Sequence, residues 1–247
     1  MKSIRTFWST PQVESCQKLY LFWDFAGVES EVDAEGEDER LKSELQSLFL
    51  HSDVLSCVES WLWRELVSAA GDRTHPWCFP SLSTVEKSSQ GELMPSSRTV
   101  VLRHADPEWH SLDFYTDYRS TKMCSLLRNG LSGSVCWLFY RHGTQGQLRV
   151  DARYEVLRGE KSEAHWRETP DVSKGLYATL DPPGSPLNDS TGGRSDADLD
   201  KAHDNFCVVR TFVQRMDLVW LDSSGNRRLQ LDYPSDTSKG CVRWLVP

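Results

Sequence analysis

Residues 98–122 read RTVVLRHADPEWHSLDFYTDYRSTK, and this stretch decides the fold class. It holds two short runs rich in Val, Leu, Phe, Tyr and Thr, near 97–104 and 111–116, with turn-forming residues between them. Such runs predict β-strands. Strands at this close spacing favour an antiparallel sheet over a fold of alternating strands and helices.

Runs of the same kind continue on both sides of this stretch. They predict six further strands, near 77–85, 133–141, 147–158, 206–221, 227–233 and 241–246. The segments His142–Gly146 and Ser223–Asn226 are typical of hairpin loops. We therefore expect a mainly β fold with flanking helices (α+β), with the strands arranged as a barrel.

Four segments have helical signals. Apolar residues recur at three- and four-residue spacing through 53–70 and share one face of 41–50. Ser120 is a good N-cap for a brief helix at Thr121–Arg128, and Glu160–Thr169 completes the set. The acidic run Glu29–Glu39 is predicted to be a solvated loop.

These signals divide the chain into two parts. Residues 1–52 form an N-terminal extension with the acidic loop, and residues 53–247 form the barrel domain. Residues 181–204 contain Pro, Gly, Ser and Asp with almost no apolar side chain, which predicts a long loop.

Composition excludes some classes of partner. The chain has 28 basic and 36 acidic residues and a net charge of -8, which disfavours general attraction to nucleic acid or to an anionic membrane. No apolar run approaches the ~18 residues of a membrane span. We expect a cytoplasmic protein with no membrane partner.

Neither cysteine nor histidine spacing predicts a metal site. The seven cysteines contain no Cys-x-x-Cys pair, and the seven histidines have no metal-ligand spacing. An odd number of scattered cysteines favours reduced thiols, and we assign no metal.

Two features within residues 98–122 suit the binding of an anion. Arg98 offers a planar fork to phosphate oxygens, although an isolated arginine is more often a solvated surface charge. Ser120, Thr121 and Lys122 open a helix whose first amide groups are free donors, although a plain N-cap explains Ser120 as well. The sequence has no glycine-rich nucleotide motif and no Gly-x-Ser-x-Gly elbow.

Taken in order, four segments resemble the pyridoxamine 5'-phosphate oxidase-like family of FMN-binding split barrels. Arg98–Arg103 is similar to that family's RxVLL(K/R) strand, and Phe114–Lys122 to its FYTN…S(R)K segment. Gln147–Val150 is similar to its RQVRV strand, and the region from Trp220 to Asp232 to its W…HRLHDR segment.

The resemblance implies an FMN-binding split β-barrel that forms a homodimer, with both subunits building each site. It implies that Arg98 and Lys122 bind the FMN phosphate beside Ser120 and Thr121, and that Gln147 reaches the flavin from the second subunit. Arg103 and Arg228 are our own candidates for steering an anionic substrate; catalytic residues are not identified. The remaining residues that the resemblance assigns to the cofactor are Thr99, Val100, Val101, Tyr115, Thr116 and Trp220.

Three positions depart from the family pattern. Thr121 stands where the oxidases carry a second phosphate-binding arginine, Gln230 replaces a histidine, and Asp232 replaces an arginine. An FMN-dependent oxidoreductase of unknown substrate is our first hypothesis. A non-enzymatic protein that stores or senses FMN, and a structural dimer that has lost the cofactor, are the alternatives.

Overall fold

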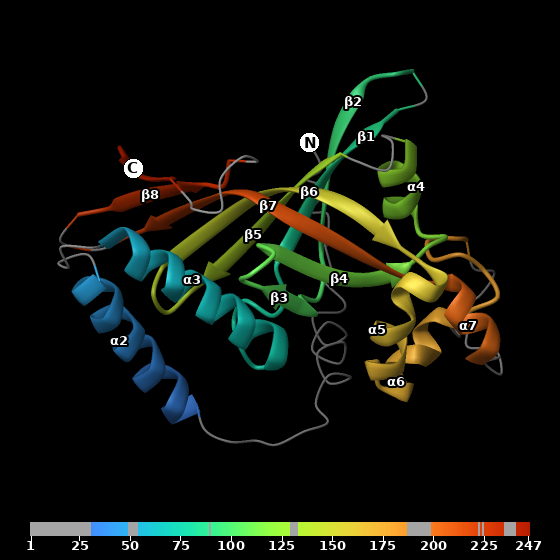
Figure 1. Cartoon of the computed structure of the whole chain (residues 1–247), viewed down its shortest axis with the longest axis horizontal. Helices are drawn as coiled ribbons and strands as arrows, with labels where there is room; N and C mark the ends of the chain where they lie inside the picture. The colour runs from blue at the N-terminus through green and yellow to red at the C-terminus, as the bar shows by residue number, and fades with distance from the viewer. Residues whose placement is uncertain are drawn as a thin grey trace, which may run out of the picture.

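A computed structural model of the chain describes residues 31–48, 54–88, 90–128, 133–186, 199–221, 223, 225–234 and 241–247. Nine strands in these ranges form one sheet, and the strand pairs in these ranges are antiparallel. Figure 1 shows the sheet with helices at its faces and at one end, so the predicted mainly β fold with flanking helices is confirmed. The strands are β1 Ser81–Lys87, β2 Leu93–Thr99, β3 His104–Asp106, β4 Ser111–Asp117, β5 Ser134–Arg141, β6 Gly146–Leu157, β7 Phe206–Trp220, β8 Arg227–Asp232 and β9 Cys241–Leu245.

The long strand β7 is the branch point of the sheet. One edge of β7 pairs with β6 along its length, while the other edge pairs first with β4, as far as Phe212, and then with β8 from Arg215. The β6–β7 register shifts by one residue between Asp151 and Ala152. Because a bulge bends a strand and increases its twist, β7 can enter two groups of strands, in the order β2-β1-β5-β6-β7-β4-β3 and, separately, β7-β8-β9.

The segment 100–103 joins the two ends of the first group. The amides of Val100 and Leu102 donate to the carbonyls of Pro80 and Cys78, and the amide of Arg103 donates to the carbonyl of Asp113 on β4. The strand predicted near 97–104 is therefore wrong in extent. β2 ends at Thr99, because the backbone groups that follow it bond to two different neighbours instead of one partner strand.

Two helices cover one side of the sheet. In α3 (Val54–Gly71), Val58, Leu62 and Leu66 are fully buried in the main core, which confirms the helix predicted from the periodicity of 53–70. The helix α2 (Glu31–Leu48) packs against α3, and Leu41 and Leu45 join the same core.

The acidic loop predicted at Glu29–Glu39 is wrong from Glu31 onward, because these residues continue α2. Asp38 on this helix accepts a hydrogen bond at 2.6 Å from the buried Arg141 at the end of β5, so an acidic residue of this run fixes the helix to the sheet. Residues 1–30 and the 52/53 domain boundary lie outside the described residues.

The other helices lie near the ends of the strands. They are α4 (Thr121–Arg128), which packs on β1 and matches the predicted bounds, a 3-10 turn (Gly159–Ser162), α5 (Glu163–Glu168), α6 (Asp171–Lys174), a second turn (Gly175–Tyr177) and α7 (Leu199–Asn205). Figure 1 shows α5, α6 and α7 gathered beside the start of β7, opposite β8. The loop predicted at 181–204 therefore ends in a helix, and 187–198 lie outside the described residues.

Several shorter predictions were close. Strands 111–116, 133–141 and 147–158 each match an observed strand within one residue at either end, and the hairpin loop after His142 is confirmed by the Arg141–Gly146 pairing. The strand predicted near 77–85 begins only at Ser81, because the chain turns at Trp77 and bends at Cys78 and Phe79. Among the described helices, none is both long and apolar enough to cross a membrane.

Candidate functional site

Three elements bring polar and cationic side chains together beneath α4. Lys122, in the first turn of α4, donates from Nζ to Oγ1 of Thr116 at the end of β4, over 2.6 Å. The same Oγ1 lies 3.4 Å from the hydroxyl of Ser120, which precedes the helix. Thr116 and Ser120 are buried, so the hydroxyl of Thr116 holds the Lys122 ammonium away from open solvent.

Arg98 lies on β2, and its charge acts on Lys122. Its Nη1 donates to Oγ1 of Thr84 at 2.6 Å and to the carbonyl of Leu82 at 3.4 Å, and its Nη2 donates to Oγ of Ser96 at 2.6 Å and to Oε1 of Glu86 at 3.0 Å. Four contacts fix the plane of the guanidinium. Glu86 also neutralises part of its charge, so an incoming anion must share Arg98 with this carboxylate.

The positive charges of Arg98 and Lys122 favour the binding of an anion here. Burial lowers the pKa of the Lys122 ammonium, and the charge of Arg98 lowers it further. Within the described part of the chain, Lys122 forms no ion pair, and its one hydrogen bond is to a neutral hydroxyl. Two cations, two hydroxyls and the first amides of a helix form a donor set that suits phosphate. The residues present therefore fit the phosphate end of FMN. We call Arg98, Thr116, Ser120 and Lys122 the phosphate cluster.

The other residues predicted around the cofactor differ in their surroundings. Val100 is buried, Val101 is half-buried, and Thr99 and Thr121 are exposed. Tyr115 neighbours Thr116 on β4, and successive side chains of a strand point to opposite faces. Its ring packs against Phe206, so its side chain joins the α5–α7 end of the molecule instead of the phosphate cluster.

Tyr115 belongs to a second polar group that the sequence did not reveal. Its hydroxyl lies 3.2 Å from Nδ1 of His165, and Nη2 of Arg210 lies 3.4 Å from Nε2 of the same ring. Arg210 also binds the fully buried carboxylate of Asp113. Burial raises the pKa of Tyr115 to about 12 and lowers that of His165, so both rings are neutral near pH 7.

Arg103, predicted to steer a substrate, lies over this second group. Its guanidinium carbon is 5.8 Å from the centre of the Tyr115 ring, and no described carboxylate pairs with it. A half-buried guanidinium that has no carboxylate partner among the described residues suits an anionic ligand. The signal for His165, which lies against the Tyr115 hydroxyl, is weak in the sequence, because a lone histidine in a short helix has no characteristic spacing.

Gln147 on β6, Trp220 on β7 and Arg228 on β8 lie far along the strands from Thr116 of the phosphate cluster. Gln147 pairs with Val219, whereas Thr116 pairs with Cys207, twelve residues earlier on β7. At about 3.3 Å per residue this separation is up to roughly 40 Å along the strand. One chain therefore does not bring Gln147 to its own phosphate cluster.

The surroundings of this far end limit two predicted roles. Trp220 is packed in the main core with 2% of its surface exposed, and Arg227 lies over its ring. Arg228 donates from Nε and Nη2 to both carboxylate oxygens of the buried Asp217, at 2.9 and 2.8 Å, and Arg149 binds Asp217 as well. Asp217 therefore fixes the Arg228 side chain and neutralises part of its charge.

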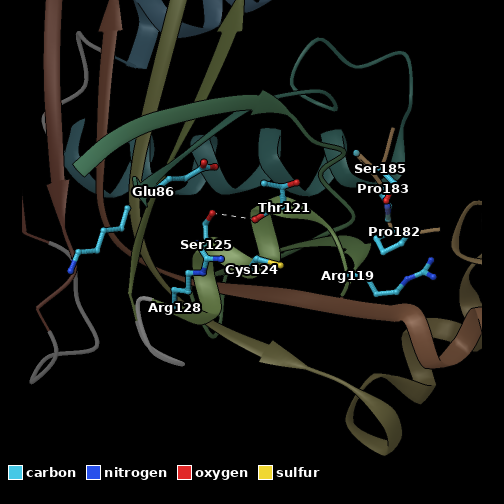
Figure 2. Close-up of a pocket in the computed structure, with 11 residues that line it drawn as sticks. Glu86, Arg119, Thr121, Cys124, Ser125, Arg128, Pro182, Pro183 and Ser185 are labelled. Carbon is cyan, nitrogen blue, oxygen red and sulfur yellow. Dashed lines mark hydrogen bonds between the residues drawn. The ribbon is translucent and has the colours of Figure 1, made fainter. Parts of the chain in front are cut away.

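A pocket of about 330 Å³ opens beside α4. Its walls include Thr121, Ser125 and Arg128 on one side of the helix, Glu86 at the end of β1, and the segment Pro182–Ser185. Figure 2 shows Thr121 between Glu86 and this segment, with Arg128 farther from the segment.

Arg119 also borders the pocket, although the sequence did not single it out. Figure 2 shows its guanidinium directed away from Thr121. The reason is its bonding to both oxygens of Asp117, to Oγ1 of Thr179 and to the carbonyl of Leu180. Arg119 therefore connects the turn before α4 to the segment that leads into Pro182–Ser185.

Comparison with known proteins finds similarity to one family. Residues 60–158 match the family model of the pyridoxamine 5'-phosphate oxidase FMN-binding domain. The pyridoxine/pyridoxamine 5'-phosphate oxidase of Bordetella petrii is 31% identical over 90 residues, which are 36% of this chain and 39% of that protein. The match thus spans about two fifths of the length of that relative.

Two solved structures share the fold. One is a pyridoxamine 5'-phosphate oxidase-related, FMN-binding protein from Nostoc punctiforme, with a TM-score of 0.60, 20% identity, and coverage of 74% of this chain and 95% of that one. The other is PhzG from Burkholderia lata in complex with tetrahydrophenazine-1-carboxylic acid, with a TM-score of 0.57, 20% identity, and coverage of 76% and 91%. The predicted family resemblance and the split-barrel fold are confirmed. The family match includes Arg98, Lys122 and Gln147 but ends before Trp220 and Arg228.

Proposed function

We propose that this protein is an FMN-dependent oxidoreductase that binds the FMN phosphate at the phosphate cluster and acts on a small anionic molecule. The observation that carries the proposal is Lys122: its ammonium is held beside Arg98 with no described carboxylate partner. A site with two cations and too little negative charge favours an anionic ligand. The FMN-binding domain matched by residues 60–158 supports the choice of FMN.

The cluster is organised before the ligand arrives. Hydrogen bonds to Thr84 and Ser96 hold the Arg98 guanidinium, and the hydroxyl of Thr116 holds Lys122. Because these side chains are already ordered, binding a phosphate costs less side-chain entropy. Ser120 and the free amides at the start of α4 add neutral donors, which replace part of the charge that an arginine at position 121 supplies in the oxidases.

A second copy of the chain completes the site in this proposal. Gln147 lies far from the phosphate cluster of its own chain, so its predicted contact with the flavin requires another subunit. Its neighbour on β5, Tyr140, is 48% exposed, and Leu138 on the same face is 38% exposed. An apolar surface beside a proposed ligand-binding residue supports a homodimer in which this face is covered.

Bound FMN would supply hydride transfer, and the protein supplies position and charge. Arg103 lies within 5.8 Å of the Tyr115 ring with no described ion pair, and it attracts an anionic substrate toward the barrel. The hydroxyl of Tyr115, neutral near pH 7, offers a hydrogen bond beside it. Arg228 contributes less to substrate binding, because Asp217 binds two of its nitrogens.

Titration of the apoprotein with FMN and with riboflavin tests the proposal. The two ligands share the ring system and differ in the phosphate, so FMN should bind at least tenfold more tightly. Equal affinities would remove the phosphate cluster from the argument. Reduction of the bound flavin by NAD(P)H or by an amine, followed by reoxidation, separates an oxidoreductase from a protein that only stores or senses FMN.

A further inference from the structure

The pocket beside α4 is lined by direct neighbours of the phosphate cluster. Thr121 borders the pocket and directly follows Ser120 of the cluster, and Glu86 borders the pocket while accepting a hydrogen bond from Arg98. Its volume of about 330 Å³ lies within the range of small-molecule sites, roughly 300–1,000 Å³. FMN bound through Arg98 and Lys122 ends at its phosphate, so it leaves this pocket unused.

The small side chain at position 121 helps to keep the pocket open. Thr121 is exposed at the start of α4, and the segment across the pocket approaches it at Gly184. A Cβ added to Gly184 would lie 3.4 Å from Oγ1 of Thr121, so the two walls are in near contact at this end. An arginine at position 121 would extend into the same space.

The charges around the pocket suit a second phosphate. Arg128 lies two turns after Thr121, about 10 Å along the helix. In the described part of the chain no carboxylate pairs with Arg128, whereas Glu86 is already paired with Arg98. The prolines at 182 and 183 add apolar surface to the opposite wall.

We propose that this pocket receives the phosphate-linked nucleotide part of a dinucleotide flavin, so that the protein binds FAD as well as FMN. The inference rests on the proposed function, because the flavin-side phosphate is taken to lie at Arg98 and Lys122. The second phosphate then lies within reach of Arg128, and the adenosine lies between α4 and Pro182–Ser185.

The test measures the affinities of purified FMN and purified FAD for the apoprotein by flavin fluorescence, with the identity of each flavin checked after binding. We expect FAD to bind wild-type protein within about tenfold of FMN. Thr121→Arg should lower FAD affinity by at least tenfold, because its side chain fills the pocket, while FMN affinity stays equal or increases. Thr121→Ser keeps the space and should change neither affinity.

Arg128→Ala provides an independent variant that leaves the pocket open. It should weaken FAD about tenfold, as expected for the loss of one charge-assisted contact, and leave FMN unchanged. Arg167→Ala, an exposed arginine on α5, is the matched control and should affect neither flavin.

The outcomes separate this inference from the proposed function. Binding of FMN with FAD more than about tenfold weaker in the wild type overturns the inference and leaves FMN binding intact. Equal effects of Arg128→Ala on FMN and FAD also overturn it, because the arginine would then not distinguish the nucleotide part. Failure of both flavins to bind the wild type refutes the proposed function itself.

Discussion

Replacing Lys122 by Met should weaken FMN binding without destabilising the apoprotein. The ammonium is fixed by Thr116 and has no described counter-ion, so its main electrostatic partner would be the ligand phosphate. Loss of a hydrogen bond to a charged group costs about 1.5–3 kcal/mol. This corresponds to a roughly 10- to 150-fold weaker dissociation constant for FMN.

If Lys122 served only to support the fold, its loss would destabilise the apoprotein. We expect Lys122→Met to stabilise the apoprotein instead. Met has a similar length and no charge, so Lys122→Met removes a cation that burial and Arg98 disfavour. Each 1 kcal/mol of relief would raise the unfolding midpoint of a chain of this size by about 2–4 °C. Thr116 keeps its contact with the hydroxyl of Ser120 in the variant.

Fluorescence titration with FMN and thermal unfolding of the apoprotein measure the two effects. Lys161→Met, at an exposed lysine in the turn before α5, is the matched control and should leave both unchanged. An FMN affinity within threefold of the wild type would refute the assignment of Lys122 to the phosphate. A clear fall in the unfolding midpoint would show that Lys122 supports the fold instead.

Further outcomes are expected for ligand affinity, subunit number, turnover and stability. Arg98→Ala should lower FMN affinity by about one to two decades, and Glu86→Gln, which removes the competing carboxylate, should raise it; opposite results in the same titration would contradict the shared contact. Light scattering of the FMN-bound protein should give the mass of a dimer, and a monomer would exclude a site built from two chains. Turnover of pyridoxamine and pyridoxine 5'-phosphates should fall below the usual enzymatic range of ~1 to 10³ per second, because Gln230 and Asp232 replace cationic residues of the oxidases; a steady-state assay decides this. Without ligand, the free energy of unfolding should increase as pH rises from the lowered pKa of Lys122 toward 10.5. In this pH range the unfolded chain binds more protons than the folded protein does. Denaturant titrations should show this increase in the wild type and not in Lys122→Met.

Much of the local structure could be predicted because its causes are local. The helix α3 follows from the spacing of apolar residues such as Leu62 and Leu66, and α4 begins directly after Ser120, as the sequence predicts. Strands β4, β5 and β6 follow from short runs of β-branched and aromatic residues. The limits of β2 and the helical state of the acidic run could not be read in this way, because both depend on partners distant in sequence.

The phosphate cluster likewise has features that the local sequence predicts and features that depend on distant partners. The segments that contain Arg98 and Lys122 were recognisable from the sequence, since residue types and spacing within a strand or a helix start are local properties. The engagement of Arg98 by Glu86 and the packing of Trp220 were not, because they arise where strands pair.

The sequence by itself determined the class of fold, the family resemblance and the candidate phosphate-binding residues. Tertiary structure alone decided that Thr116 joins Lys122 while Tyr115 joins His165, that Asp217 holds Arg228, and that a pocket opens beside Thr121. The physical reason is that strand direction, register and barrel closure set which side chains meet. These depend on hydrogen bonds between segments far apart in the chain, which no short window of sequence contains.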